Sequence, residues 1–338
     1  MTVTMPAGVQ SARDLTGPAI SAAVARLSPA VRTVAAYHLG LADAAGQPIP
    51  GGAGGKALRP ALALLSARAA GAAPERGVVP AAAVELVHNF SLLHDDIMDG
   101  DTERRHQPTA WTVYGVGAAI LAGDALLALA QDVLLETQPY GVWAARCLSA
   151  AVQRLIAGQG SDLAFERRDD VSVDECLVMA GDKTAALMAC ACSIGVIYVG
   201  GPANLAMSLS GFGAHAGLSF QLVDDMLGIW GAPEVTGKPV GSDLRARKKS
   251  VPVVAALTSG TAAGRDLAEL LASPEPFTDD DVSRATGLVE DAGGKEQIEA
   301  MADKELASAL SCLSSSEMPA DVQAEFAAIA EFITARQW

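Results

Sequence analysis

Residues 84–99 read VELVHNFSLLHDDIMD, and apolar residues recur in this stretch at three- and four-residue spacings, as on one face of an α-helix. On such a helix Asp95 and Asp99 lie one turn apart and share a face, while Asp96 lies about 100° round the axis. Three carboxylates this close repel one another, and hard cations such as Mg²⁺ relieve the repulsion through oxygen ligation. The stretch therefore predicts a helix that ends in a Mg²⁺ site, with a solvated helix end as the alternative.

The same helical spacing continues through most of the chain, whereas alternating strand patterns bounded by turns are scarce. Glycine and proline interrupt it at intervals that leave room for helices of ordinary length. We predict an all-α fold with a single-domain helical bundle over residues 31–338, preceded by an N-terminal arm over residues 1–30.

Composition excludes some classes of protein. The chain has 338 residues, of which half are apolar, and this content is enough to bury a sizeable core. Its 24 basic and 39 acidic residues give a net charge of -15, which argues against a nucleic-acid binder. A phosphate-bearing partner would therefore need a local basic cluster or bridging metal ions. The five cysteines form no CxxC pair, which predicts reduced thiols and a cytoplasmic protein.

Residues 184–223 contain no Asp, Glu, Lys or Arg. Gly200, Gly201 and Pro202 divide this segment, and the apolar run before them is shorter than the ~20 residues that span a bilayer. We predict two buried helices here and a chain without a membrane span. Asp224 and Asp225 end the segment, and buried charges at that place require partners, of which a metal ion is one. A helix emerging into solvent is the alternative.

Basic residues also occur in groups. They are Lys56 and Arg59, Arg104 and Arg105, Lys183, Lys238, and Lys248 with Lys249. Each alone is typical of a solvated surface, but lysine and arginine near glycine also suit phosphate oxygens. Two acidic groups combined with several basic ones, in a charge-poor chain, indicate a diphosphate held partly through Mg²⁺ and partly by direct cation contacts.

Two histidines lie in the quoted stretch. His88 and His94 are possible bases or ligands, with hydrogen bonding in the core as the default for both. The pair His94-Asp95 also occurs in HD-type phosphohydrolases. That function needs further histidine ligands, and His38, His106 and His215 stand in no convincing pattern.

Five motifs taken in order resemble one family. They are GGKALRP (54–60), HNFSLLHDDIMDGDTERR (88–105), DKTAAL (182–187), FQLVDDMLG (220–228) and TGKPVGSDLRARKKS (236–250). From residue 54 to residue 252 the chain thus resembles the trans-isoprenyl diphosphate synthases, also called polyprenyl synthetases. The resemblance implies an isoprenoid-synthase-type helical bundle around a deep central cavity, usually as a homodimer. It also implies condensation of isopentenyl diphosphate with an allylic diphosphate.

The resemblance also implies roles for individual residues. Three Mg²⁺ ions would be ligated by Asp95 and Asp99 together and by Asp224, with Asp96 and Asp225 supporting the sites and Asp225 also counted as a ligand. The allylic diphosphate would be held by Arg104, Lys183 and Lys238, with Lys248 nearby. The diphosphate of isopentenyl diphosphate would be held by Lys56, Arg59, His88 and Arg105. Thr184 and Gln221 would line the reacting centre and stabilise positive charge.

The resemblance also implies that the length of the prenyl product depends on the residues just before the first aspartate motif, which lie about one helical turn below Asp95. Phe90 is five residues before Asp95, and the smaller Ser91 follows it. One bulky residue beside a small one resembles a geranylgeranyl (C20) synthase, with a farnesyl synthase as the alternative. Phe90 as an ordinary core residue is the other interpretation.

The second aspartate motif departs from the family pattern, because Gly228 replaces its last aspartate. This change leaves two other functions open. A class I terpene cyclase also ionises a prenyl diphosphate, but it needs no second diphosphate site. A non-catalytic partner subunit would tune another synthase, although the complete first motif argues against it.

Overall fold

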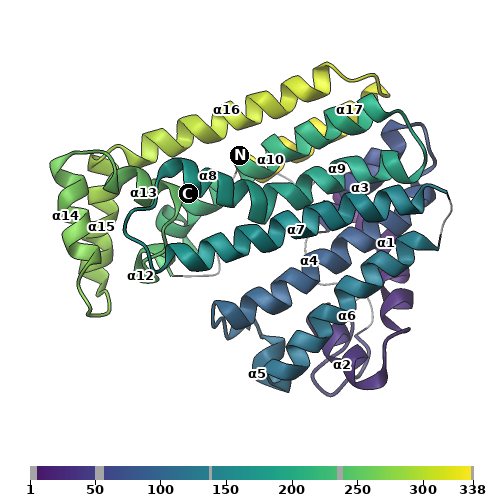
Figure 1. Ribbon diagram of the computed structural model, residues 1–338, viewed down its shortest axis with the longest axis horizontal. Coiled ribbons are helices and arrows are strands. Elements are labelled where there is room, and N and C mark those ends of the chain that lie inside the picture. The colour runs from purple at the N-terminus through teal and green to yellow at the C-terminus, as the bar shows by residue number, and fades with distance from the viewer. Residues whose placement is uncertain (1–5, 50–56, 137–138, 234–238, 336–338) are drawn as a thin grey trace. The chain divides into compact units, whose positions relative to one another are not determined.

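The computed structural model describes residues 6–49, 57–136, 139–233 and 239–335 (Figure 1). It is helical almost throughout, which confirms the all-α prediction. The α-helices are α1 (Ala7–Val24), α2 (Pro29–His38), α3 (Leu58–Ala69), α4 (Val78–Met98), α5 (Ala110–Tyr114), α6 (Val116–Leu135), α7 (Gly141–Phe165), α8 (Val173–Ala180), α9 (Ala186–Tyr198), α10 (Ala203–Trp230), α12 (Ser242–Arg245), α13 (Val251–Leu257), α14 (Ala262–Leu271), α15 (Asp279–Asp291), α16 (Gly294–Ser314) and α17 (Ala320–Thr334). A 3-10 helix, η1 (Pro74–Gly77), a π-helix, η2 (Gly181–Ala185), and the two-residue strands β1 (Glu103–Arg104) and β2 (Gln107–Pro108) complete the elements.

The helices form two compact units. The first unit comprises residues 1–152, 189–210 and 315–329, and the second comprises residues 153–188, 211–314 and 330–338. The boundaries fall within α7, α9, α10 and α17, so each of these helices supplies residues to both units. The domain boundary predicted at residue 30 stays a prediction. In the first unit, α1 packs against α3 and α4, and its residues Val9 and Ala12 are buried.

Helix α4 is the central helix of the first unit. It packs against α1, α3, α5 and α6, and the side chains from Ala81 to Val84 are all buried (Figure 1). A helix surrounded in this way must be apolar on every side, as the sequence is over those turns. Burial ends at its C-terminal turn, where Met98 and Asp99 are exposed. The acidic motif thus lies at the point where a core helix reaches the surface.

The second unit holds the second aspartate motif. Leu222, Val223, Met226 and Leu227 of α10 are buried in one hydrophobic cluster that also contains Val251 and other residues of α8, α13 and α16. Helices α14 and α15 lie side by side in the same unit (Figure 1). Helices α8 and α15 each begin with a capping box, in which a Ser or Thr hydroxyl and an acidic side chain satisfy the first backbone N–H groups. These caps fix where the helices start.

Two helical stretches, Val116–Leu135 and Val173–Tyr198, are long and apolar enough to cross a membrane by length and composition alone. The second contains the charged Asp182 and Lys183. Of its most apolar 18 residues, 67% are buried inside the protein, which is typical of a core helix. Of the most apolar 18 residues of the first stretch, only 44% are buried. Helices α9 and α10 are separated by residues 199–202, which confirms the two helices predicted on either side of the Gly-Gly-Pro turn.

Candidate active site

The first acidic motif has the helical geometry expected of it. Asp95 is half-buried and Asp99 is exposed, and the Asp99 N–H donates to the Asp95 carbonyl over 2.8 Å, one turn apart. Asp96 is only 1% exposed. The two acids predicted to share a face are therefore the accessible ones, and the intervening acid points into the protein.

Asp96 holds the arginine loop that follows α4. Its Oδ1 accepts a hydrogen bond of 2.6 Å from Arg104 Nε, in an ion pair whose carboxylate is almost fully buried. Burial raises the pKa of Asp96, and the Arg104 guanidinium opposes the rise. Arg104 lies on β1, and the turn to β2 consists of Arg105 and His106, both with positive φ. Two consecutive left-handed residues are typical of a tight hairpin turn. The hairpin therefore fixes both arginines relative to the acidic end of α4.

A second cationic cluster forms around Arg59 in the first unit. Arg59 Nη1 lies 3.2 Å from His88 Nε2, which accepts the hydrogen bond because arginine only donates. Glu85, 6% exposed, accepts a hydrogen bond of 3.1 Å from the Asn89 amide. Burial lowers the pKa of Arg59, and the Glu85 carboxylate opposes this shift. Arg59, His88 and Arg105 were predicted to bind a diphosphate together, and the structure brings Arg59 and His88 into contact.

Neutral histidines border this cluster. Burial lowers the pKa of His88 well below its ordinary value, and the positive charges of Arg59 and Arg105 lower it further. Burial and the charges of Arg105 and Arg104 lower the pKa of His38 to about 3. Both imidazoles are therefore neutral at pH 7, and neither competes with the arginines for an anion. Sequence reasoning missed His38, and also Glu85, an acid within an apolar run of α4.

Phe90 and Ser91 lie in the core of the first unit, 5% and 7% exposed. The Phe90 ring meets the His94 ring edge-on, with centroids 4.9 Å apart. His94 Nε2 lies 3.1 Å from the Ile120 carbonyl of α6, and Gly123 of α6 leaves the space in which the imidazole lies. Half-buried His94 thus packs with Phe90 against α6, and its Nε2 also lies 3.7 Å from Oδ1 of the exposed Asp124. The Ser91 hydroxyl donates to the His88 carbonyl over 2.8 Å, one turn earlier in the helix.

In the second unit, Lys183 and Thr184 lie on the π-helix η2, between α8 and α9. Such single π-turns inside α-helices frequently occur at functional sites. Lys183 Nζ forms an ion pair of 2.6 Å with Asp162 Oδ2 of α7. Gly158 of α7 permits this arrangement, because a Cβ there would lie 2.7 Å from the Lys183 Cα. The predicted lysine is thus positioned by backbone-to-backbone contact between α7 and the π-turn.

Thr184, Gln221 and Asp225 form a hydrogen-bonded chain. The Thr184 hydroxyl donates to Gln221 Oε1 over 2.6 Å, and Gln221 Nε2 donates to Asp225 Oδ1 over 2.9 Å. Asp225 Oδ2 accepts from the Val251 backbone N–H over 3.1 Å. This chain fixes which way the Gln221 amide faces, since its oxygen and nitrogen each have a partner. The roles predicted for Thr184 and Gln221 at the reacting centre stay predictions.

The two acids of the second motif differ in exposure to solvent, as those of the first motif do. Asp224 is exposed, whereas Asp225 is 4% exposed and both of its oxygens accept hydrogen bonds from the protein. Burial raises the pKa of Asp225 to about 6, against the opposing charge of Lys248. The metal-ligand role predicted for Asp225 stays a prediction. In this structure its carboxylate instead holds Gln221 and the start of α13.

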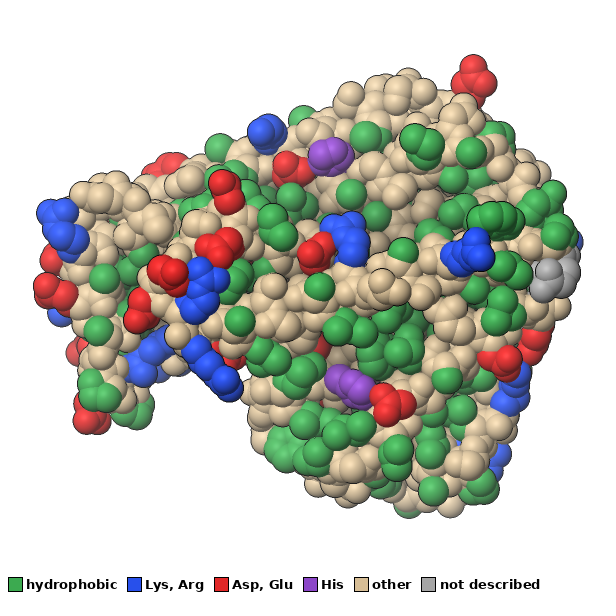
Figure 2. Space-filling view, viewed as in Figure 1, with side chains coloured by type: hydrophobic (Ala, Val, Ile, Leu, Met, Phe, Trp, Pro, Cys, Tyr) green, Lys and Arg blue, Asp and Glu red, His purple; other side chains and the backbone are tan. Residues whose placement is uncertain are grey.

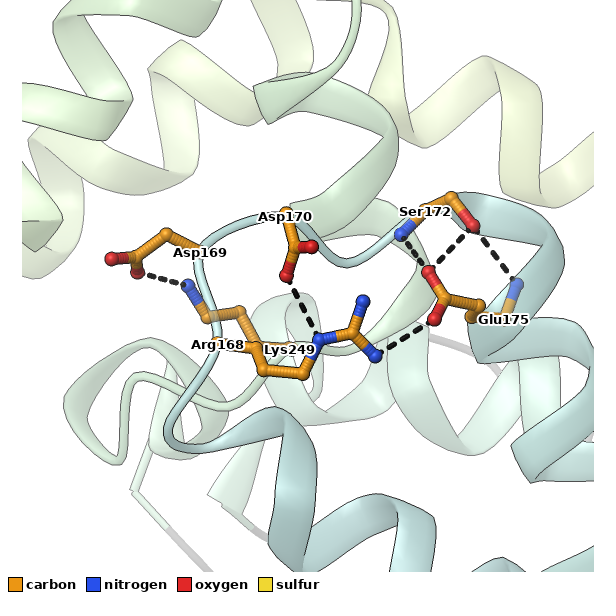
Figure 3. Close-up of polar contacts among 6 residues, drawn as sticks. All are labelled: Arg168, Asp169, Asp170, Ser172, Glu175 and Lys249. Atoms are coloured by element: carbon orange, nitrogen blue, oxygen red, sulfur yellow. Dashed lines mark hydrogen bonds and ion pairs between the residues drawn. The ribbon is translucent and has the colours of Figure 1, made fainter.

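The side chains of Lys248 and Lys249 lie in different surroundings. Burial alone would lower the pKa of Lys248, but nearby carboxylates, of which Asp225 and Asp243 act most strongly, raise it. Lys249 extends to Asp169 in the loop between α7 and α8, with Nζ 3.4 Å from Oδ1 (Figure 3). In that loop Arg168 bridges Asp170 and Glu175 (Figure 3). Lys248 thus belongs to the acidic site, and Lys249 anchors a neighbouring loop.

Oxygen donors predominate at both acidic motifs. No group of three or more His, Cys, Asp or Glu side chains able to hold a metal ion occurs among the described residues. Mg²⁺ is usually bound by only one or two carboxylates, with water and substrate phosphates completing its shell. Accessible Asp95 and Asp99 in the first unit, and Asp224 in the second, are donors of this kind. The residues therefore fit Mg²⁺ that binds together with a diphosphate. The histidine-rich centre of an HD-type phosphohydrolase is not formed in the described part of the chain.

Lys56 and Lys238 lie outside the described residues. A cavity of about 680 Å³ in the first unit is lined by α1, α3, η1 and α17, and none of the predicted site residues lines it. The predicted deep central cavity is therefore not this one, and it stays a prediction.

Comparison with known proteins identifies the family. The polyprenyl synthetase model matches residues 50–289. The chain is 46% identical to the (2E,6E)-farnesyl diphosphate synthase of Mycobacterium tuberculosis, over 96% of this chain and 92% of that protein. It is 44% identical to the geranylgeranyl diphosphate synthase of the same organism, over 90% and 87%. A crystal structure of a polyprenyl synthetase from Streptomyces coelicolor A3(2) matches with a TM-score of 0.92 and 51% identity, over 97% and 98% of the two chains. The chain belongs to the polyprenyl synthetase family, and it is a prenyltransferase.

Proposed function

We propose that the protein joins isopentenyl diphosphate to an allylic diphosphate with the help of Mg²⁺, and that its main product is geranylgeranyl diphosphate. The observation that carries the proposal is the Arg59–His88 contact with Arg105 nearby, a cationic cluster additional to the arginine and acids at the end of α4. One prenyl diphosphate needs one such site. A second cluster supports a second diphosphate, and therefore condensation of two substrates.

The residues suit the chemistry of that reaction. The allylic C–O bond breaks, and the diphosphate leaves with the bonding electrons. The double bond of isopentenyl diphosphate then forms the new C–C bond, and a proton is lost to the released diphosphate. Bound Mg²⁺ supplies positive charge that stabilises the leaving diphosphate. The family resemblance implies that Arg104 and Lys183 would add positive charge and that the oxygens of Thr184 and Gln221 would stabilise the developing cation.

The same cluster separates this function from its alternatives. A terpene cyclase would ionise its substrate without isopentenyl diphosphate, and a partner subunit would release no diphosphate under any condition. The experiment incubates purified protein with Mg²⁺ and C5, C10 or C15 allylic diphosphates, with and without isopentenyl diphosphate. We expect diphosphate release that requires isopentenyl diphosphate, together with a linear C20 alcohol after dephosphorylation, identified by mass spectrometry. A cyclic hydrocarbon would favour the cyclase, and a linear C15 product would favour the farnesyl alternative.

Chain length is the finer part of the proposal. The two mycobacterial relatives carry farnesyl and geranylgeranyl names at nearly equal identity, so similarity alone does not decide between C15 and C20. The C20 proposal is supported by the bulk of Phe90 one turn before the acids and by the small Ser91 beside it.

Phe90→Ala is expected to lengthen the product beyond C20, because removal of the ring would deepen the space below the first aspartate motif. Mass spectrometry of the dephosphorylated products measures the change. Phe326→Ala, which removes another fully buried ring from the first unit, is the matched control and should leave the product at C20. An unchanged C20 product from Phe90→Ala would exclude Phe90 as the floor of the cavity.

We propose a homodimer through α6 and the start of α7. Leu121 is 60% exposed and Trp143 58% exposed, and hydrophobic side chains gather over α6 in Figure 2. Exposed apolar patches of this kind are typical of a protein–protein interface. Light scattering is expected to give twice the chain mass of 34.5 kDa. Leu121→Lys should lower that mass, and Val178→Lys, which charges an equally exposed residue of α8, should not. A monomeric wild-type protein would refute the dimer.

We also propose a cytoplasmic location. The five cysteines form no disulfide in the structure, as expected of a reducing compartment. Fractionation of cells, with detection of the protein in the soluble fraction, tests this location.

A further inference from the structure

Two cysteine thiols lie against each other in the first unit, on helices that are well separated in the sequence. Cys147 of α7 and Cys190 of α9 have their sulfur atoms 3.7 Å apart, within hydrogen-bond reach for sulfur. The Ser193 hydroxyl of α9 lies 3.9 Å from the same Cys147 sulfur. Both cysteines are free thiols. Because a disulfide bond is about 2.05 Å long, a small approach of the two sulfurs would join α7 to α9.

The two thiols differ in their exposure to solvent. Cys190 is 4% exposed, whereas Cys147 is only partly buried. The side chain of Cys147 turns toward α9, because its sulfur touches the buried sulfur of Cys190. One thiol of the pair is therefore accessible to a small solute, and the second lies directly behind it.

The surroundings favour the thiolate form of Cys147. The Cys190 thiol lowers the pKa of Cys147 by hydrogen bonding, burial opposes this shift, and the Ser193 hydroxyl adds to the lowering. The same contact and burial raise the pKa of Cys190 well above its ordinary value. Burial also raises the pKa of Cys176 and Cys192, so Cys147 alone among these four cysteines has a lowered pKa. The thiolate is the form of cysteine that reacts with oxidants.

We infer that Cys147 and Cys190 form a redox-sensitive modification site, at which a hydroperoxide converts the two thiols into a disulfide and slows turnover. The Cys147 thiolate attacks hydrogen peroxide, so that an S–O bond forms and the O–O bond breaks. The hydroxide that leaves takes up the proton released by the Cys147 thiol. The Cys190 sulfur then attacks the sulfenic acid, the S–S bond forms, the S–O bond breaks, and water leaves with the Cys190 proton. The two thiols lose two electrons, and one hydrogen peroxide becomes two water molecules.

The disulfide acts on the segment that carries Lys183. Helix α9 begins directly after the π-turn, and Cys190 stands six residues after Thr184. Helix α7 carries Asp162, which pairs with Lys183, and Gly158, which packs against the Lys183 backbone. Both helices thus lead from the cysteine pair to the π-turn, and drawing them together at the pair displaces the groups around Lys183. The loss of turnover rests on the proposed function, whereas formation of the disulfide does not.

The experiment treats the reduced full-length protein, as it assembles in solution, with hydrogen peroxide and then blocks the remaining thiols by alkylation. Peptide mass spectrometry is expected to find a Cys147–Cys190 disulfide, with fragmentation distinguishing Cys190 from its neighbour Cys192. Turnover should fall about 10-fold or more, because a shift of about 1 Å in a positioning group has effects of this size or larger. A thiol reductant should restore the activity.

Variants of the pair should keep their turnover under peroxide. Cys147→Ala and Cys190→Ala each remove one partner, so neither can form the disulfide, and either one that folds is sufficient. Melting temperatures measured before treatment identify a variant that fails to fold. Cys312→Ala, which removes a partly exposed cysteine of α16, is the matched control and should be oxidised and slowed like the wild type.

Three results would overturn the inference. They are the absence of a Cys147–Cys190 disulfide in the peroxide-treated folded protein, full turnover of the disulfide form, and an equal loss of turnover in the variants that lack one partner. A wild type that forms the disulfide but condenses no substrates would support the modification site and refute the proposed function instead.

Discussion

Asp95→Ala is expected to lower kcat by about 10²–10³-fold or more, the range seen when one preorganised electrostatic group is removed from an active site. Asp95 and Asp99 are the accessible acids of the first motif, whereas Asp96 is buried and paired with Arg104. The adjacent Asp96 therefore cannot take its place by a change of rotamer without breaking its ion pair with Arg104. Steady-state turnover over a range of Mg²⁺ concentrations measures the effect, and excess Mg²⁺ should restore only part of the activity.

The control for this variant is Asp303→Ala, which removes an exposed acid from helix α16 and should leave kcat unchanged. Circular dichroism of both variants establishes that the helices are intact. Near-normal turnover in Asp95→Ala, with an unchanged Mg²⁺ requirement, would contradict the metal role proposed for Asp95.

Gly158→Ala is expected to reduce both stability and turnover. The added Cβ would lie 2.7 Å from the Lys183 Cα and 2.9 Å from the Asp182 carbonyl carbon. These are backbone atoms, so the π-turn itself has to move. Overpacking of this kind costs about 1–3 kcal/mol in the free energy of unfolding. A shift of about 1 Å in a positioning group can lower the rate about 10²-fold. Denaturant unfolding and steady-state turnover measure the two effects.

Gly160→Ala provides a matched control on the same helix. Gly160 also lies in α7, but nothing lies within 4 Å of a Cβ at that position. This variant should keep its turnover and become slightly more stable, because alanine favours a helix over glycine. Equal behaviour of the two variants would show that contact between α7 and the π-turn does not position Lys183.

The sequence predicts features that follow from local helical geometry. Placing Asp95 and Asp99 on one face and Asp96 on another needs only the spacing of residues along a helix. The same reasoning finds the turn between α9 and α10, because glycine and proline interrupt a run of apolar residues. In both cases the determining residues lie within a few turns of one another.

Contacts between distant residues could not be predicted in this way. Gly228 was interpreted only as a missing acid, because nothing in its neighbourhood indicates that Asp243, fifteen positions later, lies against it. Helical spacing likewise did not identify Glu85, whose buried carboxylate accepts a hydrogen bond from Asn89 and opposes the effect of burial on the pKa of Arg59. The difference between Asp224 and Asp225 depends on α13, whose first N–H one of them holds. Such pairings depend on how helices pack, and no local spacing encodes them.

The π-turn at Gly181–Ala185 has a consequence for insertions and deletions. A π-turn places one residue more in a helix than α-helical winding would, so α8 and α9 are out of phase with each other by that residue. Loss of a single residue here would let one regular α-helix continue from Val173 to Tyr198. The fold would keep its helix, but Lys183 and Thr184 would rotate away from Asp162 and Gln221. In this segment the number of residues, and not only their identity, determines where Lys183 and Thr184 lie.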